Sequence, residues 1–599
     1  MLSEVDAAEQ QGLLTASAGR NIRKWLTEAC YAEFLPELTR HIAEQRWRQL
    51  EDVFWTTIPF GTGGRRGRMY PIGTNAINDR TIGESAQGLA DYLNSILPQG
   101  QPRACAIAYD TRHRSRHFAE LCAEIMVASG FRVYFLDDFR STPEMSFLVR
   151  HKQCDCGIMV TASHNPPSDN AVKVYWSTGG QVLPPHDQAI IACVDRVEHI
   201  QRAAFADAVA TGQVELCTAE IDEAFLSTLA RQSFPGPRDG HVVYTPLHGV
   251  GASAVCPLLA RAGIRQVTVY PPHAAPDGDF PNVPGHVSNP ENAQVFTDVI
   301  EFARTAGADL VLATDPDCDR MGCAAPRSTK ADAEWATLNG NQLAALLTDY
   351  VLSQRKAAGT LSSRHYLIKT LVTTEMVRRI GESYGVAIHG DLPVGFKWIG
   401  GVMDEQGPAE FVFGCEESHG YLVGQYARDK DGAVACLLMT ELVLRARAAG
   451  KSVWEKLDDL YWQHGLHTEQ LLTFQMEGAE GMAQMQRLMH RFRTAPPASL
   501  GGQAVVGTRD YLTLRRAVGG QVEPLHGPKT DLIFLDLAAK GNCLAVRPSG
   551  TEPKVKFYLF AVTPAEQLAD LADAKAEHAA RLARLGAEVH AWASSCGTE

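Results

Sequence analysis

The chain has no excess of basic residues. Its 56 lysines and arginines are outnumbered by 69 aspartates and glutamates, which gives a formal net charge of −13. A protein that binds nucleic acid or an anionic membrane needs a basic patch to hold the phosphates. The charge balance therefore argues against both partners, although a few local cations can still hold a small phosphorylated substrate.

Long apolar runs and paired cysteines are also missing. No apolar stretch reaches the ~20 residues that span a bilayer, and the opening MLSEVDAAEQQG is polar and acidic, unlike a signal peptide. The fourteen cysteines are scattered and form no CxxC pair, so reduced thiols are the simplest interpretation. We expect a cytoplasmic protein without a membrane partner, monomeric or weakly homo-oligomeric.

What the sequence does contain is an alternation of short apolar runs and amphipathic helices. A chain of 599 residues is too long for one core, which rarely grows past about 250–300 residues. Runs such as ACAIAY (104–109) and DLVLAT (309–314) alternate with helical patterns, which predicts an α/β fold class with three similar α/β domains and a C-terminal α+β domain. The expected segments are a helical extension at 1–55, domain 1 at 56–238, domain 2 at 239–337, domain 3 at 338–455 and domain 4 at 456–599.

Two helix starts carry the spacing of a capping box. Ser141-Thr-Pro-Glu144 places a serine three residues before a glutamate, with proline early in the helix. Thr563-Pro-Ala-Glu566 has the same spacing before an alanine-rich stretch. We therefore predict that one helix opens at Ser141 and that a long helix runs from Thr563 to about residue 585.

A polar segment with a central serine directly follows the apolar run GIMV. It reads Thr161-Ala-Ser163-His164-Asn-Pro-Pro167, with Lys173 shortly after it. Ligands of open α/β sheets gather beyond the carboxyl ends of strands, so Ser163 stands where a reactive residue is expected. A hydroxyl nucleophile needs a base, a cation or a metal, and His164 and Lys173 are the local candidates. The neighbours do not form the G-x-S-x-G of a hydrolase elbow; a plain Asn-Pro turn remains open.

Three aspartates at alternate positions follow DLVLAT, in Asp315-Pro-Asp317-Cys-Asp319-Arg320. Carboxylates this close repel one another unless a cation neutralises them, and a hard divalent cation with oxygen ligands is the natural partner. Magnesium keeps few protein ligands and fills its shell with water or phosphate oxygens. The glycine and glutamate of an EF-hand loop are missing; a solvated acidic turn remains open.

Two further polar loops follow apolar runs later in the chain. Gly414-Cys-Glu-Glu-Ser-His-Gly-Tyr421 offers carboxylates and a hydroxyl that suit the vicinal hydroxyls of a sugar. Arg547-Pro-Ser-Gly-Thr-Glu-Pro-Lys554 offers a guanidinium that can hold phosphate oxygens with two hydrogen bonds. Taken alone, the first segment can also be interpreted as an acidic surface loop and the second as an ordinary turn.

One glycine-rich segment points to a different class. Gly249-Val-Gly251-Ala-Ser-Ala254 fits the G-x-G-x-x-A pattern of dinucleotide-binding domains and follows the strand-like HVVYT. Such a site also requires an acidic residue after the next strand. Here QVTVY runs into Pro271-Pro272, which disfavours a dehydrogenase.

The four polar loops occur in one order that resembles a known family. TASHNPPSDNAVKVYW, ATDPDCDR, GCEESHGY and RPSGTEPK look like the four active-site loops of the α-D-phosphohexomutase superfamily, and the resemblance spans roughly residues 55–560. PFGTGGRRG, GFKWIG and RDKDG are further matches. Within the superfamily, the resemblance is to the phosphoglucomutase and phosphopentomutase branch. It is carried by the motif GFKWIG and by the combination of EES with RDKDG. The resemblance implies four domains around a central active-site cleft, the fourth able to pivot.

Carried over motif by motif, the resemblance implies a role for each loop. Ser163 is implied as the phosphoserine and, through its phosphate, as a metal ligand beside Asp315, Asp317 and Asp319. The implied catalytic groups are Ser163, His164, Lys173, Arg320 and Arg66, although the neighbouring Arg65 competes with Arg66 for its place. The implied substrate-binding residues are Glu416, Ser418, Lys397, Arg547, Ser549, Gly550 and Thr551.

The resemblance implies a phosphosugar mutase with sugar phosphates as its partners. It would interconvert glucose 1-phosphate and glucose 6-phosphate through a phosphoserine enzyme and a 1,6-bisphosphate, with Mg²⁺ as cofactor and glucose 1,6-bisphosphate as activator. A phosphopentomutase and a glucose 1,6-bisphosphate synthase remain alternatives within enzymes. A sugar-phosphate sensor on the same scaffold is the alternative outside them.

Overall fold

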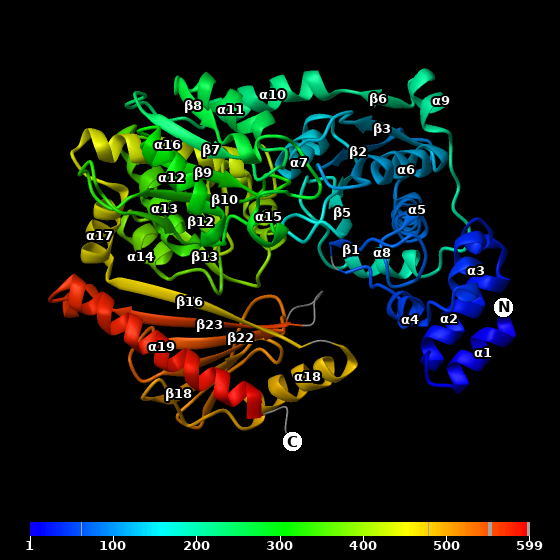
Figure 1. Ribbon diagram of the computed structural model, residues 1–599. Coiled ribbons are helices and arrows are strands. Elements are labelled where there is room, and N and C mark those ends of the chain that lie inside the picture. The colour runs from blue at the N-terminus through cyan, green and yellow to red at the C-terminus, as the bar shows by residue number, and fades with distance from the viewer. Residues whose placement is uncertain (62, 477, 549–553, 596–599) are drawn as a thin grey trace. The chain divides into compact units, whose positions relative to one another are not determined.

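The computed structural model describes residues 1–61, 63–476, 478–548 and 554–595, and they form two compact units (Figure 1). The first unit comprises Met1–Ser233, Arg238–Cys323 and Gln425–Leu437. The second comprises Phe234–Pro237, Ala324–Gly424 and Leu438–Glu599.

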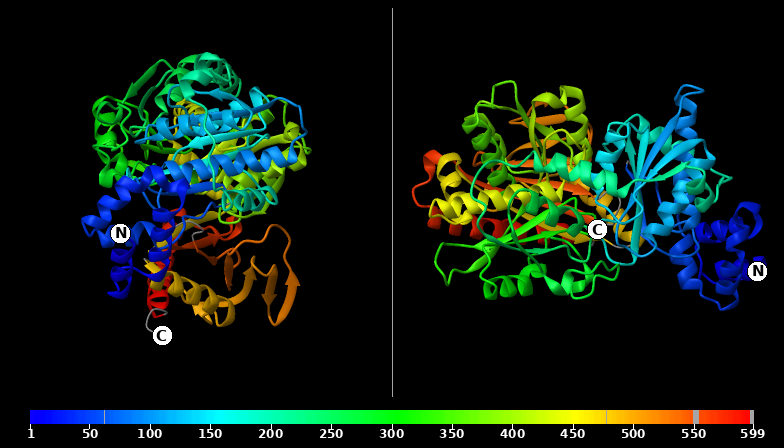
Figure 2. Two further views of the ribbon diagram at one scale, coloured as in Figure 1. Left: turned by 90° about the vertical axis from the view of Figure 1, so that its right-hand side faces the viewer. Right: turned by 90° about the horizontal axis from the view of Figure 1, so that it is seen from above.

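The first 55 residues are helical, as their periodicity predicts. The helices gather into one cluster in both views of Figure 2, around the ring of Trp25. Trp25 stacks on Tyr31 at 4.7 Å and meets Phe34 and Phe54 at 5.1 and 5.2 Å between ring centroids. This extension thus has a small aromatic core of its own. Its elements are α1 (Leu2–Gln10), α2 (Ala16–Thr27), η1 (Ala29–Phe34), α3 (Leu35–Ala43) and α4 (Trp47–Phe54).

A six-stranded sheet follows in the first unit, in the order β1-β5-β4-β2-β3-β6. Strands β2, β3, β4 and β6 are parallel, whereas β1 and β5 pair antiparallel at one edge. The strands are β1 (Gly64–Arg68), β2 (Arg103–Tyr109), β3 (Phe131–Phe135), β4 (Cys156–Val160), β5 (Asp169–Trp176) and β6 (Val214–Leu216). The helices are α5 (Asp79–Ile96), α6 (Ser115–Ala128), α7 (Thr142–His151), α8 (His186–Val194), α9 (Phe205–Ala210) and α10 (Thr218–Ala230).

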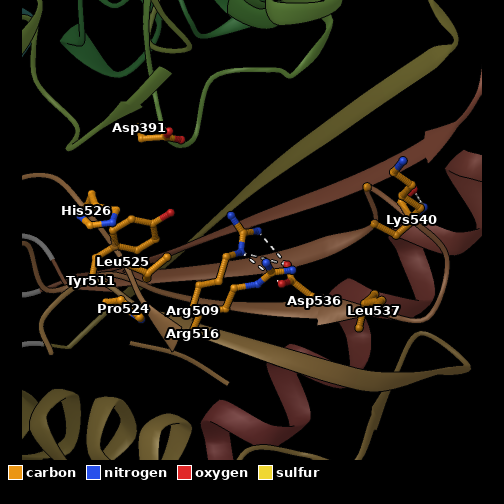
Figure 3. A pocket seen from close by; sticks show the side chains of 12 residues that line it. Asp391, Arg509, Tyr511, Arg516, Pro524, Leu525, His526, Asp536, Leu537 and Lys540 are labelled. Carbon is orange, nitrogen blue, oxygen red and sulfur yellow. Dashed lines mark hydrogen bonds and ion pairs between the residues drawn. The ribbon is translucent and has the colours of Figure 1, made fainter. Parts of the chain in front are cut away.

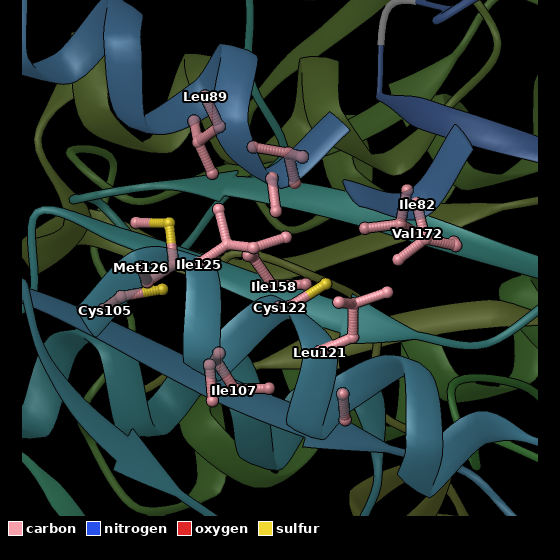
Figure 4. Packing of buried hydrophobic residues seen from close by; sticks show 14 of the residues in the cluster. Ile82, Leu89, Cys105, Ile107, Leu121, Cys122, Ile125, Met126, Ile158 and Val172 are labelled. Carbon is pink, nitrogen blue, oxygen red and sulfur yellow. The ribbon is translucent and has the colours of Figure 1, made fainter. Parts of the chain in front are cut away.

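The core of this sheet is built from β-branched and long aliphatic side chains. Ile107 on β2 and Ile158 on β4 lie among side chains of α5 and α6, such as Leu89 and Ile125 (Figure 4). Parallel strands buried on both faces read as continuous apolar runs rather than as alternating ones. For this reason the runs at 104–109 and 157–161 indicated strands so clearly.

A second parallel sheet of the first unit places β7 (His241–Thr245) between β8 (Gln266–Val269) and β9 (Leu310–Thr314). The strand β10 (Met321–Pro326) carries the chain into the second unit. The helices here are α11 (Ala252–Arg261), η2 (Pro271–His273), η3 (Pro284–His286), η4 (Ala293–Phe296) and α12 (Thr297–Thr305).

The second unit contains a four-stranded sheet in the order β13-β12-β14-β15. Its strands are β12 (Tyr366–Thr370), β13 (Ala387–Leu392), β14 (Phe411–Glu416) and β15 (Gly420–Val423), and β11 (Trp335–Leu338) precedes them. The helices are α13 (Gly340–Ala357), α14 (Met376–Ser383), α15 (Phe396–Gln406), η5 (Pro408–Glu410), α16 (Gly432–Ala448), which starts in the first unit, and α17 (Val453–His464).

The C-terminal part is a largely antiparallel sheet in the order β16-β23-β22-β21-β18-β19-β20, with β17 paired to β18. One face packs against α18 and α19, and Leu585 and Val589 of α19 lie in that core (Figure 1). The elements are β16 (Leu466–Gln475), α18 (Gly478–Thr494), β17 (Ser499–Leu500), β18 (Gln503–Asp510), β19 (Arg515–Val518), β20 (Gln521–Pro524), β21 (Ile533–Leu537), β22 (Cys543–Pro548), β23 (Lys554–Thr563), η6 (Ala565–Gln567) and α19 (Leu571–Ser595).

Of the two predicted helix starts, the one at Ser141 is confirmed and the one at Thr563 is not. Ser141 caps α7 by accepting a hydrogen bond from the backbone N–H of Glu144 at 3.2 Å, as predicted. The start at Thr563 is wrong: this residue ends β23, and its hydroxyl pairs with Nε2 of His578 at 2.8 Å. Because the short turn η6 intervenes, the helix begins only at Leu571 and runs to Ser595.

The fold class is confirmed: α/β domains precede a C-terminal domain built on a separate sheet. Across the part of the chain that the structure describes, no helix combines the length and the apolar character that crossing a membrane requires.

Candidate active site

The serine loop begins where β4 ends and holds Ser163 in an unusual backbone conformation. Ser163 has a φ of 53°, in the left-handed region that non-glycine residues seldom adopt. Its N–H donates to the hydroxyl of Thr161 at 2.8 Å. A strained residue persists only where its surroundings determine its conformation, and such residues cluster at functional sites.

Arg112 fixes this loop through its main chain. The buried guanidinium donates to the carbonyl oxygens of Ser163 at 2.6 Å, Pro166 at 2.7 Å and Asp169 at 3.0 Å, and to that of Asn165. A second buried group, Asp110, accepts from the hydroxyl of Thr161 at 2.6 Å and lies 3.4 Å from Nε of Arg112. The serine is therefore positioned by side chains about 50 residues earlier in the chain.

The aspartate loop begins where β9 ends, and the structure brings it to the serine. The carboxylates of Asp315, Asp317 and Asp319 are buried and offer oxygens that all lie within 4.8 Å of one another. The hydroxyl of Ser163 donates to Oδ2 of Asp315 at 2.7 Å. Residues 152 positions apart thus form one site inside the first unit.

The three carboxylates strongly influence one another. Burial and the charges of Asp319 and Asp317 raise the pKa of Asp315 well above its ordinary value. Burial also acts to raise the pKa of Asp317, but Lys173 and the hydroxyl of Thr142 lower it overall. The cluster therefore stays ionised only where positive charge is supplied.

Positive charge reaches the cluster from three separate segments. Nζ of Lys173 lies 2.9 Å from Asp317, and Nζ of Lys430 lies 2.8 Å from Asp319. Nε of Arg320 lies 3.8 Å from Asp319 and 3.9 Å from Asp315, while its guanidinium also pairs with Glu291. Two buried oxygens, Oδ1 of Asp317 and Oδ1 of Asp319, have no hydrogen-bond partner among the described residues.

These oxygens make the cluster suitable for a metal. Hard oxygen donors in a small acidic loop are what Mg²⁺ or Ca²⁺ prefer. Buried carboxylate oxygens without a hydrogen-bond donor would be costly unless a cation satisfied them. The residues present therefore fit a divalent cation held by the three aspartates.

The structure separates the two neighbouring arginines of the FGTGGRRG segment. Arg65 is buried and donates to Glu84 at 2.7 Å and to the carbonyl of Thr81 at 2.8 Å, both on α5. Arg66 points the other way and lies 3.5 Å from Oδ1 of Asn165 in the serine loop. Alternation along β1 places only Arg66 beside the predicted site.

His164 and Thr142 complete the surroundings of the serine and the aspartates. Nδ1 of His164 lies 3.3 Å from Oγ of Ser163. The hydroxyl of Thr142 donates to Asp317 at 2.7 Å, and its N–H donates to the carbonyl of the same residue at 3.0 Å. The N-terminus of α7 thus supports the aspartate loop.

The remaining predicted residues belong to the second unit. Glu416 ends β14 and is buried, and its neighbour Glu417 accepts from the hydroxyl of Thr370 at 3.3 Å. A Cβ on Gly340 would come within 1.8 Å of the carbonyl oxygen of Glu417, so only glycine fits there. Ser418 follows in the turn between β14 and β15.

Lys397 lies in the first turn of α15, with its ammonium over the ring of Trp398, and Arg547 lies near the end of β22. Ser549, Gly550 and Thr551 fall outside the described residues.

The glycines of the G-x-G-x-x-A segment have a packing role. A Cβ on Gly249 would lie 2.3 Å from Cα of Pro316, between two of the aspartates. A Cβ on Gly251 would lie 2.1 Å from the hydroxyl of Tyr244 and 2.4 Å from that of Thr314. The pattern therefore lets this turn approach the aspartate loop closely, which is a different use from binding a dinucleotide.

Sequence reasoning missed Arg112, Asp110, Thr142 and Lys430 as parts of this site. Lys430 lies in the RDKDG motif, so the motif itself was a signal for it. The other three stand outside the matched motifs, and only the tertiary structure brings them to the loops.

Comparison with known proteins defines the class to which this fold and site belong. Models of phosphoglucomutase/phosphomannomutase α/β/α domains I, II and III match residues 57–201, 223–328 and 339–463, and the model of the C-terminal domain matches residues 532–578. The chain belongs to the phosphoglucomutase/phosphomannomutase family, and so to the α-D-phosphohexomutase superfamily.

Individual relatives show which kind of mutase the chain is most similar to in sequence. Phosphoglucomutase of Staphylococcus epidermidis is 31% identical over 510 residues, which cover 84% of this chain and 90% of that protein. Phosphoglucomutase of Staphylococcus aureus is 31% identical over 529 residues, covering 87% and 93%. The protein is therefore a mutase of the phosphoglucomutase type, an intramolecular phosphotransferase.

Two solved structures share the fold. The Paramecium phosphoglucomutase parafusin, in an open form, has a TM-score of 0.63 at 16% identity, covering 91% of this chain and 95% of that one. A phosphoglucomutase/phosphomannomutase family protein of Burkholderia thailandensis has a TM-score of 0.62 at 17% identity, covering 88% and 97%.

The role of Arg112 gives a first prediction. We expect Arg112→Lys to lower kcat of the mutase about 100-fold with a smaller change in KM, because lysine keeps the charge but cannot hold several carbonyls at once, and a displacement of about 1 Å costs that much. Steady-state kinetics measures it, with Arg114→Lys, which is exposed on the same segment, as the control. Equal kinetics in both variants would contradict the role.

Proposed function

We propose that this protein interconverts glucose 1-phosphate and glucose 6-phosphate through a phosphoserine at Ser163. The hydrogen bond of 2.7 Å between Ser163 and Asp315 carries the proposal, because it joins a hydroxyl to a cluster suited to a divalent cation. The mutase class of the relatives supports the same reaction. A 1,6-bisphosphate is the intermediate.

Mg²⁺ is the proposed cation, held by Asp315, Asp317, Asp319 and an oxygen of the serine phosphate. When bound, it supplies positive charge to the oxygens of the transferring phosphoryl group. Lys173, Lys430 and Arg320 already surround the aspartates, so the chain's own cations add to this neutralisation.

In the first transfer, the bond between phosphorus and Oγ of Ser163 breaks as a bond forms to the free sugar hydroxyl. The hydroxyl proton passes to a basic group, for which His164 and Lys173 are the candidates. The bisphosphate then turns over, and its other phosphate returns to Ser163, which regenerates the enzyme. Phosphoryl transfer depends mainly on positioning and charge neutralisation, which the anchored serine loop provides.

Substrate binding is assigned to the second unit. Glu416 and Ser418 are proposed to bind sugar hydroxyls, with Lys397 nearby in the sequence motif GFKWIG. Arg547, Ser549, Gly550 and Thr551 are proposed to hold the phosphate that is not reacting, and Arg66 to meet the phosphoryl group at the serine loop. The contact of Arg66 with Asn165 favours it over the buried Arg65.

The phosphoserine is tested first. We expect Ser163→Ala to lose turnover at least about a thousandfold, as removal of a covalent nucleophile does, and to keep its affinity for glucose 6-phosphate in calorimetry. Labelled phosphate from glucose 1-phosphate should remain on Ser163 of the wild type. Ser168→Ala, an exposed serine of the same loop, is the matched control. Label elsewhere, or activity in Ser163→Ala, would refute the assignment.

The metal site has a test that does not depend on activity. Asp317→Asn keeps the shape of the side chain but removes a charge, so we expect calorimetric affinity for Mg²⁺ to fall at least about tenfold. Asp332→Asn, an exposed carboxylate, should leave it unchanged. An unaltered affinity in Asp317→Asn would exclude this carboxylate as a ligand.

The sugar is tested with a panel of substrates assayed with catalytic glucose 1,6-bisphosphate. We expect a higher kcat/KM on glucose 1-phosphate than on ribose 1-phosphate, because the carboxylate and hydroxyl of the 414–421 loop suit the hydroxyls of a hexose. Preference for ribose 1-phosphate would instead identify a phosphopentomutase. Net formation of the bisphosphate from another phosphoryl donor would identify a synthase.

A further inference from the structure

A cavity of about 570 Å³ opens on the C-terminal sheet, and none of the residues assigned above lines it. Its floor is formed by β18 and β21, one side by the end of β20 and the segment that follows it, and the far end by the turn between β21 and β22 (Figure 3). Asp391 of β13 lies over the opening. Its volume is in the range that small-molecule ligands occupy.

The cavity wall concentrates positive charge. Arg509 on β18 and Arg516 on β19 are direct cross-strand partners, and Figure 3 shows their side chains together. Like charges placed directly opposite each other weaken a sheet, and Asp536 is the acidic side chain of the protein that lies against this pair. Lys540 and His526 add two further basic side chains to the same wall.

The protein neutralises one of these cations but not the others. Asp536 accepts from Nη2 of Arg509 at 2.7 Å and from Nε at 3.1 Å, so this pair is satisfied. Arg516 has only a loose ion pair with Glu523 at 3.9 Å within the described ranges. Lys540 has no ion pair with any residue that the structure describes. A chain with a net charge of −13 thus keeps one unpaired and one loosely paired cation at one cavity, both of them exposed to solvent.

The rest of the wall suits the body of a small organic molecule. Tyr511, Pro524 and Leu525 line the end opposite Lys540. The guanidinium carbon of Arg509 lies over the ring of Phe534, 4.2 Å from its centroid. The carboxylate of Asp391 is tied to Arg378 at 3.6 Å, outside the cavity, but it remains largely exposed and can accept a hydroxyl.

We propose that this cavity is a second binding site for a phosphate monoester, distinct from the reaction site. The phosphate lies between Arg516 and Lys540, and the carbon body lies against Tyr511 and Leu525. A phosphate monoester carries about −1.5 to −2 charges at neutral pH, so two cations that lack a close ion pair suit it better than they suit a carboxylate. Arginine suits such an oxygen cluster because its planar fork donates two hydrogen bonds.

A ligand seated there would also touch two parts of the second unit. Asp391 belongs to the sheet that contains β12 to β15, whereas the cations belong to the C-terminal sheet. An occupied cavity would therefore slow local opening on both sides. This gives a readout that does not require turnover.

The test is hydrogen exchange by mass spectrometry on the full-length protein, with glucose 6-phosphate in one arm and inorganic phosphate in the other. We expect protection of residues 509–526 and 536–542 with glucose 6-phosphate, and weaker or no protection with phosphate alone. The double variant Arg516→Ala/Lys540→Ala should weaken the apparent affinity of this protection about 100-fold, roughly tenfold for each charge-assisted contact.

Matched controls separate this site from the reaction site. Arg515→Ala/Lys529→Ala removes two exposed charges outside the cavity and should keep the protection. Arg547→Ala, which weakens the proposed phosphate loop, should keep it as well, whether or not the proposed reaction is correct. Because neither residue belongs to the proposed reaction site, kcat on glucose 1-phosphate should be unchanged in Arg516→Ala/Lys540→Ala.

Three outcomes overturn the proposal: no protection by glucose 6-phosphate, protection that survives Arg516→Ala/Lys540→Ala, or equal loss in the control pair. Protection by glucose 6-phosphate that the double variant alone removes supports it.

Discussion

The site depends on balancing the charge of three carboxylates in a space from which water is largely excluded. Asp315, Asp317 and Asp319 are buried within 4.8 Å of one another, and their mutual repulsion is far stronger there than at the surface. The compensating positive charge comes from three separate segments, which carry Lys173, Lys430 and Arg320. These cations hold the loop together, and they leave buried oxygens for a metal. Charge balance at this point explains why segments so distant in the chain must meet.

The strands of the α/β domains could be predicted because each buried strand is a short run of apolar residues in the sequence. Strands β2, β4 and β9 lie where the runs ACAIAY, GIMV and DLVLAT indicated them, and the serine loop follows β4 and the aspartate loop follows β9 directly. The start of the last helix was misplaced, since Thr563 has the spacing of a cap but is held in β23 by sheet pairing. Arg112 and Asp110 could not be found at all, because a single buried ion pair leaves no periodic pattern.

Both central loops carry a non-glycine residue in the left-handed region: Ser163 with φ 53° and Cys318 with φ 52°. Each such residue costs of the order of 1–3 kcal/mol, which the surroundings must supply. For Ser163 they do so through Thr161 and Arg112. For the aspartate loop, backbone N–H groups of Asp319 and Arg320 donate to Asp315 at 3.1 and 3.0 Å. The main-chain conformation thus fixes the orientation of the Ser163 hydroxyl and of the aspartate carboxylates without a bound ligand.

Arg112 holds the serine loop by four carbonyl oxygens, and carbonyls are common to every amino acid. The course of the loop backbone therefore does not depend on most of the side chains that the loop carries. Substitution of most neighbours of Ser163 would therefore leave these four hydrogen bonds, and with them the course of the backbone, in place. An anchor of this kind separates the position of the hydroxyl from the identity of the side chains around it.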